Sequence, residues 1–110
     1  MKNLFYTLLL GLLLTSCSEF QKALKSEDIA EKFTLGTELF EAGKYSKANR
    51  LFAQIVPQYR GKPQAEKLMY MYSKSYYMMK DYHLSGYQFE RFESSYPRSE
   101  KAEEALFLSA

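Results

Sequence analysis

Apolar residues recur at helical spacing along most of the chain, and short breaks divide this pattern into segments. The densest segment, Leu68 to Tyr82 (LMYMYSKSYYMMKDY), carries Tyr and Met on more than one face. A helix that is apolar nearly all round needs neighbours on more than one side. We therefore expect it in the middle of the fold. One predicted stripe holds Leu68, Tyr72, Tyr76 and Met79, and a second holds Met69, Tyr70, Tyr77 and Met78.

The segments before this stretch predict a pair of helices. Asp28 has the side chain of a helix N-cap, and Gly43 readily takes the left-handed conformation that ends a helix. A second helix is expected over 45–59, with a break or kink at Pro57. Its predicted inward face consists of Tyr45, Ala48, Leu51, Phe52 and Ile55.

The pattern predicts the same arrangement again further along the chain. Pro63 is expected at the first position of a helix over 64–80, because its missing N–H costs nothing there. Asp81 is expected to cap a helix over 82–96, and Ser99 to cap one that starts at residue 100. The predicted inward face of the helix over 82–96 consists of Leu84, Ser85, Phe89 and Phe92.

The two pairs repeat with an offset of 37 residues, so that Phe52 returns as Phe89 and Tyr59 as Tyr96. Repeated hairpins near this period indicate a solenoid in which each hairpin packs on the next. We predict an all-α solenoid with hairpins over 28–60 and 64–97 and a partial third over 99–110. The pattern resembles the tetratricopeptide repeat, and the matching positions are Leu35, Gly36, Leu39, Ala48 and Phe52, then Tyr72, Ser73, Tyr76, Ser85, Phe89 and Pro97.

Residues 1–16 have the pattern of a signal peptide. Their apolar run, Leu4 to Leu14, is shorter than the roughly 20 residues that a membrane-spanning helix needs. The run leads into Leu14-Thr15-Ser16-Cys17, which resembles the lipobox of bacterial lipoprotein precursors. The resemblance implies cleavage before Cys17 and acylation of that residue, and Ser18 favours the outer membrane. Residues 17–27 are expected to form a tether that is ordered only in part.

Composition argues against catalysis. The net charge is +2, and Cys17 and His83 are the chain's one cysteine and one histidine, so neither a disulfide nor a His or Cys metal cluster is expected. The sequence has no Gly-rich phosphate loop and no Ser/His/Asp arrangement, and we predict neither enzymatic activity nor a cofactor. The acidic pairs Glu27-Asp28 and Glu103-Glu104 fall at predicted helix starts, where the helix dipole explains them.

The strings YRGKPQAEKLMYMYSKSYYMMKDYHLSGYQFERF and SSYPRSEKAEEALFLSA resemble the BamD family in its Bacteroidetes-like form. These are lipoproteins of the outer-membrane β-barrel assembly machine. The resemblance covers essentially the whole chain but only the amino-terminal hairpins of such proteins, so we expect a fragment or truncated product. It implies a non-enzymatic protein at the periplasmic face of the outer membrane. Its implied partners are unfolded outer-membrane proteins, the barrel-forming subunit and the other assembly lipoproteins, with no nucleic acid.

In tetratricopeptide solenoids, the first helix of each hairpin lines a concave surface that binds extended peptides. The resemblance puts candidate groove residues on this surface. Their aromatic rings would bind the terminal ring of an outer-membrane strand, and Lys74 would bind its free carboxylate. The alternative is that the aromatics are core and the lysines are solvated. The candidates are Phe33, Phe40, Tyr70, Lys74 and Tyr77, with Thr37, Glu41, Lys67 and Met78 nearby.

Two other functions fit a periplasmic lipoprotein of this fold. One is an adaptor that coordinates envelope constriction with wall synthesis, although such proteins usually carry a coiled-coil segment before their repeats and none is evident here. The other is an accessory to a wall-modifying enzyme.

Overall fold

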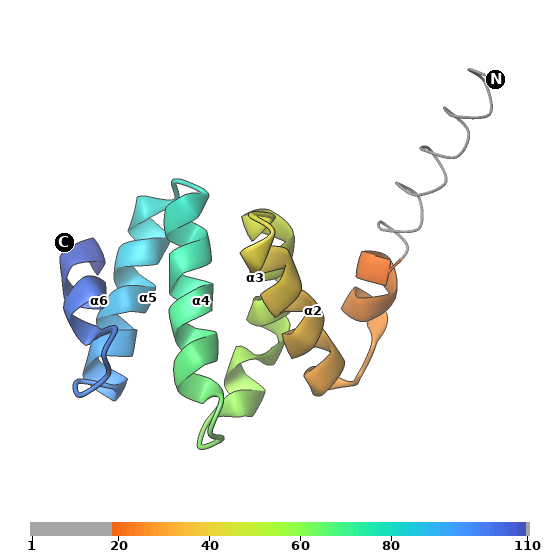
Figure 1. The fold of residues 1–110 in the computed structure, drawn as a ribbon, viewed down its shortest axis with the longest axis horizontal. Coiled ribbons are helices and arrows are strands. Elements are labelled where there is room, and N and C mark those ends of the chain that lie inside the picture. Colours follow the sequence, from red (N-terminus) through yellow and green to blue (C-terminus); the bar gives the residue numbers. More distant parts are fainter. Residues whose placement is uncertain (1–18, 110) are drawn as a thin grey trace.

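A computed structural model describes residues 19–109, and all regular elements in this range are helices (Figure 1). The signal peptide and Cys17 lie outside the described residues. A helix over 19–25 is followed by two helical hairpins and one further helix, which confirms the predicted all-α, tetratricopeptide-like architecture. The elements are α2 (Ile29–Glu41), α3 (Tyr45–Ile55), the 3-10 helix η1 (Val56–Tyr59), α4 (Ala65–Met78), α5 (Tyr82–Ser95) and α6 (Ala102–Ser109).

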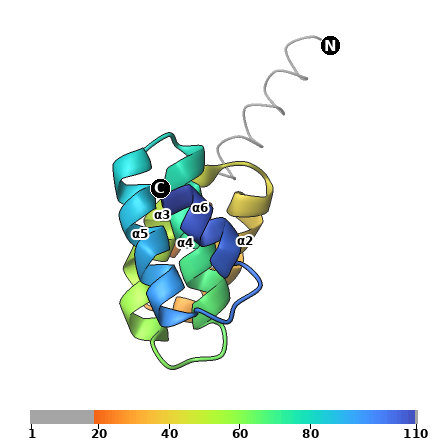
Figure 2. The same cartoon turned by 90° about the vertical axis from the view of Figure 1, so that its left-hand side faces the viewer.

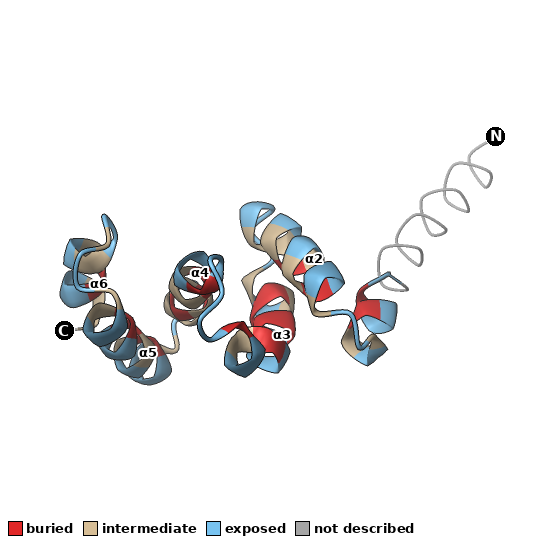
Figure 3. Cartoon of the chain, turned by 90° about the horizontal axis from the view of Figure 1, so that it is seen from below, coloured by how far each residue is buried: buried red, intermediate tan, exposed pale blue. Residues whose placement is uncertain are grey.

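The helices form two layers. Seen from below, α2, α4 and α6 lie on one side and α3 and α5 on the other (Figure 3). Figure 2 looks along the array from the α6 side and shows the helices stacked behind one another. Helix α4 packs against both α3 and α5, as its apolar surface predicts. It therefore joins the two hairpins.

The two turns inside the hairpins have the same backbone conformation. Ala42 and Met79 end their helices with φ near −80° and ψ near 0°, and the next residues, Gly43 and Lys80, are left-handed at φ 80° and 66°. The N–H of Lys44 donates to the carbonyl of Leu39 at 2.8 Å, and Asp81 donates to Tyr76 at 3.0 Å. Both are Schellman turns, which satisfy the last carbonyls of a helix. The 37-residue repeat is thus also a repeat of backbone geometry.

Besides Gly43, the expected helix caps and breaks agree with the structure at three of five positions. Asp28 accepts hydrogen bonds from the N–H groups of residues 30 and 31, Asp81 accepts from residue 84, and α3 ends just before Pro57. The expected roles of Pro63 and Ser99 are wrong, because α4 begins at residue 65 and α6 at residue 102. In both places a turn precedes the helix, and the Ser99 hydroxyl accepts from the N–H of residue 101 within it.

Phe52 and Phe89 connect the two layers at equivalent positions of the repeat. Both rings are fully buried. A Cβ atom on Gly36 of α2 would lie 2.6 Å from the Phe52 ring, so a glycine is needed for the helices to approach this closely. The equivalent residue of Gly36 in the second hairpin is Ser73, which is also fully buried. Its hydroxyl donates to the Met69 carbonyl at 2.8 Å, so the hydroxyl of this buried serine has a partner.

The expected stripes of α4 are wrong near its end. Ser73 and Ser75 are fully buried, whereas Met78 and Met79 are exposed. Ser75 is buried because its hydroxyl accepts a 2.9 Å hydrogen bond from Asn49, which ties α4 to α3. The methionines lie at the turn, where they line an open hollow together with residues 43–47. Leu84, in the first turn of α5, was expected to point inward but is exposed, while Ser85, Phe89 and Phe92 are buried as predicted.

The segment before α2 is more ordered than expected. Residues 19–25 of the segment expected to be a tether form a helix. Phe20 and Ala23 are buried with Leu51 of α3. The ammonium group of Lys47 and the guanidinium of Arg50 each lie 5.5 Å from the centre of the Phe20 ring. This helix therefore covers the outer side of the first hairpin.

Gly36→Ala should destabilise the fold even though Ala favours helix. The new methyl group would meet a buried ring, and overpacking of this kind costs about 1–3 kcal/mol, against about 1 kcal/mol gained in helix propensity. Urea unfolding would measure the difference. Thr34→Ala, at an exposed position of the same helix, is the control and should not lower stability. A Gly36→Ala protein as stable as the Thr34→Ala protein would show that α2 and α3 are not packed this closely.

Candidate binding surface

The layer formed by α2, α4 and α6 is the concave side of the array, since α4 lies set back between the other two helices (Figure 3). Tyr70, Lys74 and Tyr77 follow one another at helical spacing on α4, and all three are half-buried. They lie next to α6, which begins a new hairpin. The candidate site is therefore a seam between the first helices of consecutive hairpins.

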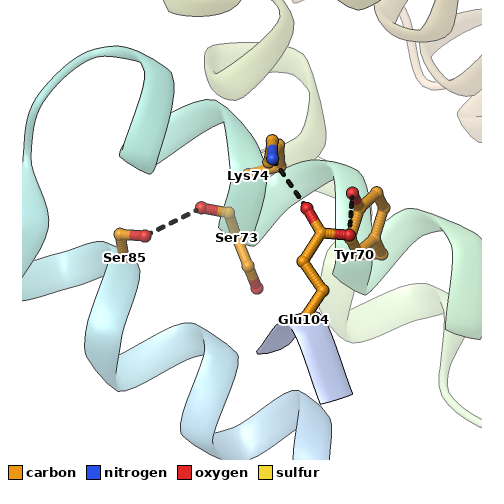
Figure 4. Close-up of polar contacts among 5 residues, drawn as sticks. All are labelled: Tyr70, Ser73, Lys74, Ser85 and Glu104. Atoms are coloured by element: carbon orange, nitrogen blue, oxygen red, sulfur yellow. Dashed lines mark hydrogen bonds and ion pairs between the residues drawn. The ribbon is translucent and has the colours of Figure 1, made fainter. Parts of the chain in front are cut away.

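One carboxylate of α6 binds two of the predicted site residues (Figure 4). The Lys74 ammonium group donates to Oε1 of Glu104 at 2.7 Å, and the Tyr70 hydroxyl donates to Oε2 at 2.9 Å. Both oxygens are thus used, each by a different donor on α4. Lys74 was expected to hold a carboxylate of a bound peptide, and in this structure it holds one that belongs to the chain itself.

The surroundings of this cluster shift the pKa values of Glu104 and Tyr70. The hydrogen bond from Lys74 lowers the pKa of Glu104, helped by the Tyr70 hydroxyl and the positive charge of Lys101, although partial burial acts in the opposite direction. Burial raises the pKa of Tyr70, and its hydrogen bond to Glu104 raises it further. At neutral pH Glu104 is therefore a carboxylate anion and Tyr70 a neutral phenol.

Aromatic rings and cations surround the ion pair. Tyr77 packs edge-on against Tyr82 with ring centres 5.4 Å apart, and the Lys74 ammonium lies 5.6 Å from the centre of the Tyr77 ring. The Lys101 ammonium lies 5.1 Å from the Tyr70 ring. Next to Tyr70, an open hollow of about 440 Å³ is lined by Glu66, Lys67, Tyr70, Phe92, Arg98, Ser99, Glu100 and Lys101.

Phe33 and Phe40 of α2 are half-buried but lie outside this cluster. The Phe33 ring stacks on Tyr59 with ring centres 5.4 Å apart. Phe40 contacts Tyr45 edge-on at 5.3 Å and approaches the ring of Phe52. Their contacts are those of the first hairpin's core, so the structure brings together Tyr70, Lys74 and Tyr77 but not all five predicted groove residues.

Glu104 is the member of the cluster that the sequence analysis did not identify. Its place in the first turn of α6 fits the dipole explanation, but that explanation misses the contact with Lys74. The 37-residue repeat does indicate that Glu104 belongs to this surface. Position 104 is equivalent to position 67, three residues before Tyr70, so it falls on the same helical face as the candidates and carries the charge opposite to that of Lys74.

The described residues were also compared with the requirements of a metal site and of a membrane-spanning helix. Within residues 19–109, no three His, Cys, Asp or Glu side chains lie together as a metal site requires. His83 is exposed in the first turn of α5. None of the helices in the described range is both long and apolar enough to cross a membrane.

Comparison with known proteins assigns the chain to a family. A family model for the outer membrane lipoprotein YfiO matches residues 25–110, a range that includes every helix from α2 to α6. The chain belongs to the YfiO family. No curated protein and no solved structure matches it. The YfiO match supports the outer-membrane lipoprotein class that the resemblance to the BamD family implies.

Glu104→Gln should lower the free energy of unfolding at neutral pH by about 0.5–1 kcal/mol, the usual contribution of a partly exposed ion pair. Folding lowers the pKa of Glu104, so this contribution is present above the ordinary glutamate pKa of about 4.3. It is lost as the pH falls through the lower value of the folded protein. The difference between wild type and Glu104→Gln should therefore shrink on acidification to about pH 3.

Urea unfolding at several pH values measures this effect. Glu103→Gln is the matched control, because Glu103 lies in the same turn of α6 but is exposed. It should show a smaller loss of stability and little change with pH. If the two variants behave alike, Glu104 acts only through the helix dipole and not through Lys74.

Proposed function

We propose that the protein is a BamD-like, non-enzymatic lipoprotein of the β-barrel assembly machinery that binds unfolded outer-membrane proteins on its concave surface. It is anchored through acyl chains on Cys17 at the periplasmic face of the outer membrane, where more than one chain gives stable attachment. The match to an outer membrane lipoprotein family supports the location and the class. Its proposed partners are the barrel-forming subunit, the other assembly lipoproteins and their client proteins.

The observation that carries the proposal is the pair of donors on α4. Lys74 and Tyr70 together bind one carboxylate, that of Glu104, at hydrogen-bonding distance and partly away from water. A barrel strand that ends in an aromatic residue presents a ring next to a free carboxylate. Such an end can take the place of Glu104, with its carboxylate at Lys74 and its ring against Tyr77. Phe33 and Phe40 extend the proposed contact surface toward α2.

Glu104 then acts as an internal competitor. Because it already occupies both donors, a client exchanges one carboxylate for another, and little net ion-pair energy is gained. The aromatic ring and the extended backbone of the client must therefore supply the net binding free energy. This exchange predicts a modest affinity for clients. A modest affinity suits a protein that must release its clients to the barrel-forming subunit.

Peptide binding to the full-length protein tests this exchange. A peptide that ends in Phe with a free carboxylate should bind about tenfold or more weakly to Lys74→Glu, a change of about 1.4 kcal/mol. Glu104→Gln should bind it about fivefold more tightly, because the competing carboxylate is gone. Amidation of the peptide should weaken binding to wild type but not further weaken binding to Lys74→Glu.

The control is Lys25→Glu, which makes the same charge change at an exposed position outside the surface and should leave affinity unchanged. If Lys74→Glu and Tyr77→Ala both bind the peptide like wild type, the concave surface is not the binding site.

A further inference from the structure

The turns inside the two hairpins, residues 41–47 and 78–84, lie at one end of the molecule (Figure 1). We call this end the turn end. Each hairpin runs up through its first helix and down through its second, so the connections between hairpins lie at the opposite end. The helix over 19–25 packs beside α3, with Phe20 against Lys47 near the start of that helix. The described chain therefore begins beside the half of α3 that is nearer the turn end (Figure 1).

Large apolar side chains are exposed at the turn end. Met78, Met79 and Tyr82 are 43%, 40% and 58% exposed, and Leu84 is exposed beside them. An open hollow of about 490 Å³ connects the two turns and is lined by residues 43–47, Met78 and Met79. Within residues 56–68 and 96–102, which form the opposite end, no large apolar side chain is exposed.

Positive charge accompanies these apolar groups. Lys44, Lys47 and Lys80 carry it, against the carboxylates of Glu41 and Asp81. Asp81 is engaged in capping α5, where it accepts a hydrogen bond from the N–H of Leu84. Lys44 and Lys80 are exposed, and the long apolar stem of a lysine lets methionine and tyrosine enter an interface while the ammonium group stays at its polar edge.

Lys80 adds a further indication, because it sits in a left-handed conformation that costs a residue with a side chain about 1–2 kcal/mol. The first hairpin has Gly43 at the equivalent position and avoids this cost. Strain of this kind marks positions where a side chain is kept for function.

We propose that the turn end lies on the surface of an anionic lipid bilayer, with Met78, Met79 and Tyr82 in the headgroup region and Lys44, Lys47 and Lys80 on lipid phosphates. This inference rests on the proposed acylation of Cys17. Two residues span at most about 7 Å, so acyl chains on Cys17 hold Glu19 next to the membrane. The turn end is then the part of the solenoid that contacts the bilayer. The helices that line the concave surface run away from the membrane.

Fluorescent probes on the full-length lipoprotein test this orientation. Met79→Cys places a thiol at the turn end, and Gln64→Cys places one at the opposite end. The proteins are reconstituted into vesicles of phosphatidylethanolamine with phosphatidylglycerol. The probe at 79 should be quenched by nitroxide-labelled lipid and protected from aqueous iodide, and the probe at 64 should show the reverse. Equal access of iodide to both probes would overturn the proposal.

A second variant tests the role of charge without risk to folding. Lys80→Gly removes a positive charge and relieves the left-handed strain, so it should fold at least as stably as wild type. In the Met79→Cys protein, it should lower the ratio of quenched to unquenched probe about fivefold, the equivalent of about 1 kcal/mol per lysine. Vesicles of phosphatidylcholine alone should show weak quenching with or without Lys80.

Two controls distinguish failure of the proposed lipid contact from failure of the proposed acylation of Cys17. A wild-type protein whose Cys17 takes the thiol probe would show that acylation has failed. Protection of the probe at 79 that appears only when envelope proteins are added would assign the turn end to a protein partner and overturn the lipid contact.

Discussion

Two buried phenylalanines hold the layers of the array together. Phe52 and Phe89 are each fully buried between the two helices of a hairpin, and Phe52 requires a glycine, Gly36, on the facing helix. This steric demand fixes how closely the helices approach. The closely packed hairpins in turn place the first helices side by side, and the concave surface depends on that placement.

The position of α4 follows from the same constraint. It belongs to the second hairpin through Phe89 and contacts the first through the hydrogen bond between Asn49 and Ser75. Its remaining side carries Tyr70, Lys74 and Tyr77 toward α6. Helix α4 therefore packs apolar side chains against two neighbouring helices and also provides hydrogen-bond donors to a polar site. Tyrosine suits both roles, because its ring packs in the core and its hydroxyl donates a hydrogen bond.

The repeat, the caps at Asp28 and Asp81 and the turn at Gly43 were predictable, because each has a local chemical signature. The helix over 19–25 was underestimated, since its burial comes from Leu51, which is distant in sequence. Burial of Ser73 and Ser75 was likewise invisible to a pattern of hydrophobicity. At the candidate site, the resemblance to tetratricopeptide repeats predicted the α4 residues, but the pairing of Lys74 with Glu104, 30 residues apart, depends on the distance between two helices.

In the proposed account, the concave surface receives the end of an unfolded outer-membrane strand, and Glu104 holds the site in its absence. The most direct measurement is cross-linking in the cell envelope with a photoreactive phenylalanine derivative at position 77 or at position 87. Tyr87 is an exposed tyrosine on α5, in the opposite layer. The account predicts cross-links from position 77, but not from position 87, to unfolded outer-membrane proteins. Equal capture at both positions, or capture only at 87, would contradict it.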